Sequence, residues 1–303
     1  SEMYTYIFVV DGVRALDPGN ALVVRDGTRY ENMFMVPGEK ATTYSSNEVP
    51  HGTLEKVWYP SPTLGMDRQM YVYTPSGYRS GTERYPVLYL LHGAGGDEDA
   101  WTTLGKAPQI MDNLIAAGRA KPMIVVMTNG NPGQAAAPGA GPVKVSAASQ
   151  GAGAMGQGKF EESLVKDVIP FIEKNYRTLP GKDNRAVSGL SMGGMQTMNL
   201  ADKYPETFSW YGVMSMGMTD RSRAGQQTDP ELLKKNLENL RASQPKLYWI
   251  ACGKDDFLYN AATTLRKFLD DNKFPYQYLE TEGGHTWTNW RIYLSELTPL
   301  LFK

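Results

Sequence analysis

Four short apolar runs, each ending in glycine, constrain the fold of this chain more than any other feature. They are YPVLYLLHG at 85–93, PMIVVMTNG at 122–130, NRAVSG at 184–189 and KLYWIACG at 246–253. Runs without polar alternation are typical of strands buried on both faces, as in the interior of a parallel sheet. Segments with the apolar spacing of helices accompany them at 107–117, 161–176, 194–203, 261–271 and 289–301. The alternation predicts an α/β fold with a mostly parallel, doubly wound sheet.

The first 37 residues have a different pattern and predict a short β-rich segment. Aromatic and apolar side chains alternate along MYTYIFVV, and Asp11-Gly12 then supplies the dipeptide of a tight hairpin turn. A segment this short buries no core of its own, so we expect it to pack on its neighbour. The polar stretch 38–50 is interpreted as a linker, and 51–303 as the main domain, which opens with two strand candidates, GTLEKVWYPS and RQMYVYTPSGY.

The stretch 131–158 fits neither a helix nor a strand. It is rich in glycine, alanine, proline and serine, and it directly follows the carboxyl end of a predicted strand. Loops longer than about 12–15 residues are usually either functional or disordered. Two interpretations therefore stay open for 131–158, a cover over a bound substrate and a disordered insertion.

Composition and charge exclude several classes of function. The formal net charge is −1 over 303 residues, and no apolar run reaches 18 residues, so neither nucleic acid nor a membrane is predicted as a partner. The first residues lack the features of a signal peptide, as would also be true of a mature secreted protein. The single cysteine, Cys252, allows no internal disulfide or thiolate metal cluster and is interpreted as a buried packing residue.

A serine among glycines is the strongest functional signal. Gly189-Leu190-Ser191-Met192-Gly193 matches the G-x-S-x-G pattern, with a predicted strand before it and a predicted helix after it. That setting is typical of a nucleophile elbow, in which a sharp turn presents the serine hydroxyl at the end of a strand. The amide of Met192 would then face the carbonyl oxygen of a bound ester. The alternative is a glycine-rich turn in which Ser191 only caps the helix.

A serine nucleophile needs a base and an acid, and the chain offers few candidates. In α/β hydrolases the order along the chain is serine, acid, histidine, and His285 is the one histidine after Ser191. The other two are His51 and His92. Between serine and histidine, the strand KLYWIACG is followed by Asp255 and Asp256, either of which fits the acid at this stage.

A second amide for the oxyanion is expected in the loop after an earlier strand. The sequence LLHGAGGDEDAW at 90–101 has the required glycines, and Ala94 is the predicted donor, with Gly93 as the alternative. His92 is interpreted as a structural residue that shapes this loop.

Together, LLHGAGG, DVIPFIEKNY, SGLSMGGMQ, CGKDD and GGHTW resemble carbohydrate esterase family 1, most of all its bacterial feruloyl esterases. The resemblance covers about 48–303 and implies an α/β-hydrolase fold. It also implies that the acid is Asp256, the fourth residue of a Gly-x-x-Asp that ends the strand. The first 37 residues resemble the C-terminal half of a family-48 carbohydrate-binding module. The alternative to a sugar-binding module is a remnant that only packs on the esterase domain.

The resemblance implies a serine esterase that hydrolyses feruloyl esters on plant cell-wall polysaccharide such as arabinoxylan, through an acyl-enzyme and without metal or cofactor. A secreted or periplasmic location would follow. An acetylxylan esterase of the same fold, an acyltransferase, a non-catalytic carbohydrate-binding protein and, more distantly, a thioester hydrolase are alternatives. Four aromatic residues near the predicted catalytic loops are candidate walls for the acyl group, unless they pack in the core: Trp101, Phe257, Trp287 and Trp290.

Overall fold

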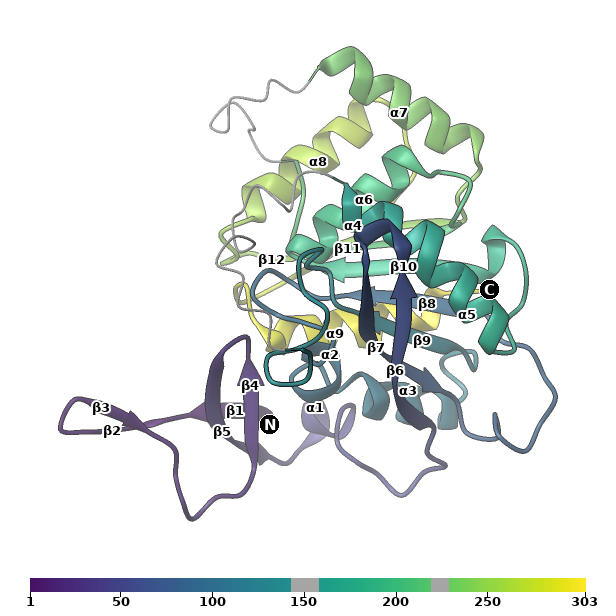
Figure 1. Ribbon diagram of the computed structural model, residues 1–303. Coiled ribbons are helices and arrows are strands. Elements are labelled where there is room, and N and C mark those ends of the chain that lie inside the picture. Colours follow the sequence, from purple (N-terminus) through teal and green to yellow (C-terminus); the bar gives the residue numbers. More distant parts are fainter. Residues whose placement is uncertain (143–157, 219–228) are drawn as a thin grey trace.

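The computed structural model describes residues 1–142, 158–218 and 229–303, and a central sheet dominates them (Figure 1). The strand order is β13 (Gln277–Thr281), β12 (Leu247–Gly253), β11 (Trp210–Met214), β10 (Arg185–Leu190), β8 (Val87–Leu91), β9 (Ile124–Thr128), β7 (Met66–Thr74) and β6 (Thr53–Ser61). Neighbouring strands from β13 to β9 are parallel, whereas β7 is antiparallel to both β9 and β6. The predicted mostly parallel sheet is confirmed.

Helices cover both faces of the sheet, as a doubly wound fold requires. One core lies under α3 (Ala107–Ala116) and α9 (Trp287–Leu297), and also takes in the short α2 (Ala100–Thr103). The opposite core lies under α4 (Lys159–Ser163), α5 (Ile169–Asn175), α6 (Met192–Lys203), α7 (Pro230–Ala242) and α8 (Tyr259–Asp271). Alternate side chains of β8 enter the two cores, Leu88 on one face and Tyr89 on the other, because successive residues of a strand point to opposite faces. Single 3₁₀ turns lie at Pro62–Leu64, Lys182–Asn184 and Thr298–Leu300.

The helix predicted at 161–176 is interrupted where its proline predicts a kink. A π-helical turn, Leu164–Val168, separates α4 from α5, and Pro170 is the second residue of α5. Proline lacks the N–H for an intrahelical hydrogen bond, and its ring clashes with the carbonyl four residues earlier. The wider π turn just before Pro170 accommodates the missing N–H and the proline ring. The expected local break in the helix is therefore confirmed.

Besides the short helices α1 and α2, the strand β11 and the helix α7 were not predicted from the sequence. β11 is only WYGVM, yet all five residues are buried, and it joins β10 to β12 in the middle of the parallel sheet. Its insertion matters for the site, because the residue after it, Ser215, lies at the same sheet edge as the end of β10. Cys252 is fully buried in β12, as expected.

The N-terminal segment forms its own small antiparallel sheet of β1 (Glu2–Tyr6), β5 (Arg29–Val36) and β4 (Val23–Asp26). The hairpin of β2 (Phe8–Val10) and β3 (Val13–Ala15) extends away from the body (Figure 1). Its turn residues Asp11 and Gly12 both have positive φ, at 49° and 83°, as a type I′ turn requires. The predicted β-rich segment is confirmed, and its likeness to a carbohydrate-binding module stays a prediction.

The segment interpreted as a linker packs against the main body. It contains α1 (Glu39–Thr42), and its Tyr44 is buried, with the hydroxyl donating to Glu2 Oε1 at 2.6 Å. Glu2 also pairs with the buried Arg291 of α9 at 2.6 Å. These contacts fasten the N-terminal sheet to the main domain, while the boundaries at 37/38 and 50/51 stay predictions.

Within the three described ranges, no helix is long and apolar enough to cross a membrane. Most of the stretch 131–158, interpreted above as a cover or an insertion, lies outside the described residues. Its first part packs on the sheet edge, where Gln69 N donates to Ala135 O at 2.8 Å.

Candidate active site

Ser191 occupies a strained turn between β10 and α6. Its backbone has φ 52° and ψ −115°, a combination that non-glycine residues rarely adopt. The turn is held by a hydrogen bond from the Ser191 amide to Met214 O at 2.9 Å. Such strain is found where the surrounding structure over-determines a functional geometry. The local structure is therefore the strand–turn–helix of a nucleophile elbow, and a capping bond from the Ser191 side chain is absent among the described contacts.

Two glycines of the motif are required by close packing. A Cβ on Gly189 would lie 2.5 Å from the carbonyl carbon of Gly193, and a Cβ on Gly193 would lie 2.6 Å from Leu91 O. Any side chain at either position would push the helix start away from the ends of β10 and β8. The glycines thus let the first turn of α6 pack tightly against the sheet.

His285 and Asp256 form a hydrogen-bonded pair at the same edge of the sheet. His285 lies between β13 and α9, and its Nδ1 is 2.9 Å from both carboxylate oxygens of Asp256. The Asp256 side chain is fully buried, while the imidazole is 17% exposed. Because a carboxylate accepts hydrogen bonds, Nδ1 carries the proton and Nε2 keeps its lone pair. Asp255, the other candidate, is exposed on the surface.

Asp256 stays ionised despite its burial. Burial alone favours the neutral acid, but hydrogen bonds from His285, the Leu258 amide and the Ser215 hydroxyl lower the pKa of Asp256 below its ordinary value. The Leu258 amide lies 2.9 Å from Oδ1. A carboxylate held as an anion in this position stabilises a positive charge on the neighbouring imidazole.

Ser215 is a residue of this network that the sequence analysis did not identify. It follows β11, has a φ of 49° and accepts a hydrogen bond from Trp290 Nε1 at 2.9 Å. Its hydroxyl helps to lower the pKa of the Asp256 carboxyl. The indole of Trp290 also packs edge-on against His285, with ring centroids 5.0 Å apart. Trp290 and Ser215 together fix both members of the His–Asp pair.

A cavity of about 210 Å³ brings Ser191 and His285 together. Its other lining residues come from the end of β10, the loop after β8, α9 and the N-terminal segment: Leu190, Gly93, Ala94, Gly96, Trp287, Trp290 and Asp26. Among the described contacts, the Ser191 hydroxyl makes no direct hydrogen bond to His285. In enzymes without substrate such bonds are often long and tighten only when the substrate is bound.

The loop after β8 lies against the serine. A Cβ on Gly93 would be 3.3 Å from Ser191 Cβ, and Ala94 lines the cavity next to it. Met192 is the first residue of α6. Its amide therefore has no acceptor within the helix, because the first four amides of a helix lack one. Both predicted oxyanion donors, Ala94 and Met192, therefore belong to backbone that borders the Ser191 side chain.

His92 joins two loops, in agreement with its interpretation as a structural residue. The Gly130 amide donates to Nε2 at 2.7 Å, so Nδ1 carries the proton and donates to Gly93 O at 2.7 Å. Complete burial lowers the pKa of His92, which keeps the ring neutral. His51, the remaining histidine, pairs with Asp112 at 3.0 Å on another part of the surface.

The four aromatic candidates lie in three different environments. Trp287 and Trp290 line the cavity, at right angles to each other with centroids 5.1 Å apart. Phe257 is 75% exposed and packs on the outer side of His285 at 4.4 Å. Trp101 is buried. Its indole N–H donates to Leu91 O at 2.9 Å, and its ring packs edge-on against the ring of Trp287. Of the two interpretations left open for Trp101, packing in the core is the one that its burial supports.

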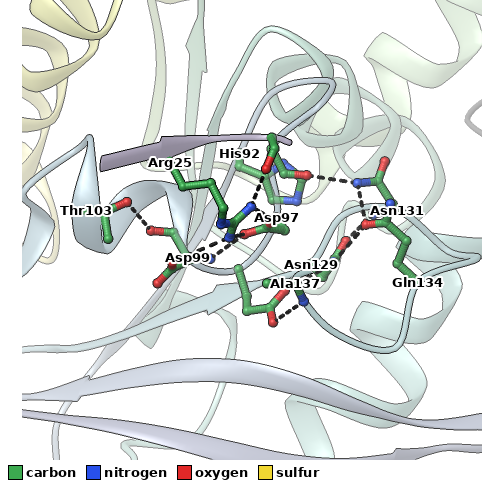
Figure 2. Close-up of polar contacts among 12 residues, drawn as sticks. Arg25, His92, Asp97, Asp99, Thr103, Asn129, Asn131, Gln134 and Ala137 are labelled. Carbon is green, nitrogen blue, oxygen red and sulfur yellow. Dashed lines mark hydrogen bonds and ion pairs between the residues drawn. The ribbon is translucent and has the colours of Figure 1, made fainter. Parts of the chain in front are cut away.

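The loop that carries Ala94 is anchored by the N-terminal segment. Arg25 of β4 makes two hydrogen bonds to the Asp97 carboxylate, at 2.6 and 2.8 Å, and reaches Asp99 at 3.4 Å (Figure 2). Both side chains of the first pair are nearly buried, at 10% and 3% exposed. The turn residue Gly27 packs so closely that a Cβ on it would lie 2.6 Å from Gly95 O. The β4–β5 turn thus presses directly on the glycine-rich loop.

On its other side the same loop is fastened to the segment after β9. The buried Glu98 accepts hydrogen bonds from Asn129 Nδ2 at 3.0 Å and from the Ala137 amide at 2.7 Å. Asn131 Nδ2 donates to Gly96 O at 3.0 Å, within the network of Figure 2. The loop next to Ser191 is therefore fixed from both directions by groups that are distant in sequence.

Replacing Arg25 with Ala is expected to lower kcat/KM by about tenfold or more and to destabilise the fold. The change leaves the buried Asp97 carboxylate without its partner, which typically costs about 3–5 kcal/mol, and a shift of about 1 Å in a positioning group can slow catalysis strongly. Steady-state kinetics and denaturant unfolding of Arg25→Ala would measure both effects. Arg79→Ala is the matched control, because Arg79 pairs with Glu55 on the exposed surface; equal kinetics for the two variants would contradict the anchoring role.

Comparisons with known proteins agree with this geometry. A family model described as "Putative esterase" matches residues 61–301. An endo-1,4-beta-xylanase/feruloyl esterase of Xylanibacter ruminicola is 35% identical over 256 residues, covering 78% of this chain and 34% of that protein. An acetyl esterase of Caldicellulosiruptor saccharolyticus is 26% identical over 171 residues, covering 48% of this chain and 64% of that protein. The chain thus spans about a third of the length of the Xylanibacter relative.

Solved structures share the fold. A ferulic acid esterase of Anaeromyces mucronatus, in complex with ferulic acid, aligns with a TM-score of 0.70 at 23% identity, over 88% of this chain and 96% of that one. An S-formylglutathione hydrolase of Staphylococcus aureus aligns with a TM-score of 0.65 at 19% identity, over 85% and 99%. The α/β-hydrolase fold is therefore confirmed, as is the resemblance to carbohydrate esterase family 1. Because the "Putative esterase" model matches residues 61–301, well over half of the sequence, the chain belongs to that esterase family.

Proposed function

We propose that the chain is a serine esterase in which Ser191 is the nucleophile, His285 the base and Asp256 the residue that orients it. Ser191 Oγ attacks the ester carbonyl while His285 Nε2 takes its proton. The protonated imidazole, stabilised by Asp256, then donates that proton to the leaving alcohol oxygen as the acyl–oxygen bond breaks. Water attacks the acyl-enzyme with His285 again as base, and releases the acid and free Ser191. The shared cavity of Ser191 and His285 is the observation that carries this proposal.

The charge that develops on the carbonyl oxygen needs its own donors, and the amides of Met192 and Ala94 are proposed for this role. Amide donors that are fixed before the reaction stabilise a tetrahedral intermediate without reorganisation. The α6 N-terminus adds a favourable dipole. These steps move protons and an acyl group only, so they need no metal or cofactor.

The acyl group is proposed to be feruloyl or another hydroxycinnamoyl group. The Xylanibacter relative is named as a feruloyl esterase, and the solved esterase of similar fold is described with ferulic acid bound. Two indole rings, of Trp287 and Trp290, border the cavity beside Ser191 and supply apolar walls for a planar aromatic acid. The alcohol would be a sugar of plant cell-wall polysaccharide such as arabinoxylan, which places the enzyme outside the cytoplasm, secreted or in the periplasm.

An acetyl ester is the second candidate, because the chain is similar to an acetyl esterase and the cavity is small. Hydrolysis of methyl ferulate and of 4-nitrophenyl acetate by the same preparation separates the two, with the spontaneous rate of each ester subtracted. A feruloyl esterase is expected to show at least tenfold higher acceleration over the spontaneous rate with methyl ferulate. If the protein accelerates hydrolysis of the acetyl ester alone, the function is that of an acetylxylan esterase and the feruloyl assignment fails.

A further inference from the structure

A second cavity, of about 420 Å³, opens beside the first and is formed by two parts of the chain. One wall comes from the N-terminal sheet, with Thr5, Asp26 and Glu31, and the other from the segment around His285. The two cavities share four lining residues: Asp26, His285, Trp287 and Trp290. The two cavities therefore adjoin at His285, while Ser191 lines only the first.

The proposed reaction gives the two cavities different roles. The acyl carbonyl must lie at Ser191, whereas the leaving alcohol oxygen must lie within reach of His285, which donates its proton. The rest of the alcohol therefore continues past His285, away from Ser191. The second cavity, which His285 lines and Ser191 does not, is the space available for this part of the alcohol, and its volume falls within the usual range for small-molecule sites.

The chemistry of the second cavity suits a neutral molecule with many hydroxyl groups. The carboxylates of Asp26 and Glu31 are hydrogen-bond acceptors, and Thr286 and Thr288 on the opposite wall supply hydroxyls that both donate and accept. The guanidinium of Arg291 is occupied by Leu104 O and Glu2, at 2.8 and 2.6 Å. Glu31 keeps its acceptor oxygens while it pairs with the exposed Arg14 at 3.5 Å, and the Trp287 ring offers a flat apolar face.

We propose that this cavity binds the sugar that carries the ester, a neutral pentose or a short oligosaccharide, and that the N-terminal segment supplies its acceptor wall. The inference rests on the proposed function and deepens it. Its structural basis is the anchoring described above, because the Arg25–Asp97 pair and the Gly27–Gly95 contact fix β4 and its neighbour Asp26 beside the catalytic loops. The N-terminal segment is then part of the catalytic unit and sets the preference for the alcohol.

The test compares two esters of the same acid, feruloylated arabinose and methyl ferulate, in wild type and Glu31→Gln. Glu31 lines only the second cavity, and its side chain is 29% exposed. The ratio of kcat/KM for the sugar ester to that for the methyl ester is expected to fall at least fivefold, because a charge-assisted hydrogen bond to a hydroxyl is lost. Glu39→Gln is the matched control, a carboxylate of the same N-terminal region in α1, and should leave the ratio unchanged.

A second variant tests the opposite wall and guards against a local folding effect. Thr288→Val keeps the shape of the side chain and removes one hydroxyl, and it should lower the same ratio. If both variants keep the wild-type ratio, the sugar site is refuted while esterase activity stands. If the wild type hydrolyses neither ester, the proposed function itself fails, so the two failures are distinguishable.

Discussion

Ser191→Ala is expected to lose at least 10³-fold in kcat, because no other group at the turn can form the acyl-enzyme. Removing any member of a serine–histidine–acid triad leaves only the contribution of binding and of the oxyanion donors. The alanine side chain fits the strained backbone no worse than serine, so the fold should persist. Turnover of methyl ferulate, measured with a sensitive fluorescence or chromatographic assay, gives the residual rate.

Ser188→Ala is the matched control for this substitution. Ser188 lies in β10, three residues before Ser191, is fully buried, and its hydroxyl donates to Gly212 O at 2.9 Å. Loss of that bond should reduce the free energy of unfolding by about 1 kcal/mol and leave kcat within a few-fold of wild type. Ser191→Ala with substantial turnover, or Ser188→Ala as inactive as Ser191→Ala, would contradict the assignment of the nucleophile.

Asp256→Asn is expected to reduce kcat by about 10³–10⁴-fold at neutral pH. An amide nitrogen in place of a carboxylate oxygen would donate toward Nδ1, which moves the imidazole proton to Nε2 and removes the base that faces Ser191. The charge that stabilises the imidazolium is lost as well. The fall should appear in kcat and kcat/KM alike, because the interaction is made in the transition state.

Asp255→Asn is the control for this change. Asp255 is adjacent in sequence but exposed, and its side chain lies outside the His285 contacts. Its activity should stay near that of wild type. If Asp255→Asn were the inactive variant and Asp256→Asn the active one, the acid would have to be reassigned.

The sheet and the catalytic motifs could be predicted from the sequence because their signals are local. Each buried strand is a continuous apolar run, and the elbow is specified by glycines within five residues of Ser191. β11 was missed because WYGVM is short, contains two aromatic residues and a glycine, and lacks a flanking turn signal. Its burial depends on its neighbours β10 and β12, which no local pattern of β11 reveals.

The remainder of the site depends on contacts between distant segments. Arg25 and Asp97 are 72 residues apart, and neither belongs to a motif that signals the other. Ser215 acts through a network with Trp290 and Asp256 that exists only once β11 has entered the sheet. Two interpretations stayed open for Trp101, a wall for the acyl group and packing in the core, because a position in sequence does not specify the direction of a side chain; the burial of Trp101 supports the second.

Covalent labelling shows whether Ser191 is made nucleophilic by His285 and Asp256. The protein is treated with an alkyl fluorophosphonate, digested with trypsin and analysed by tandem mass spectrometry, with His285→Ala treated in parallel. We expect one phosphonate on Ser191, in the peptide 186–203 that also contains Ser188, and little or no label in His285→Ala. An unlabelled Ser191 in active wild-type protein, or equal labelling of Ser191 in both proteins, would contradict the activation of Ser191 by His285.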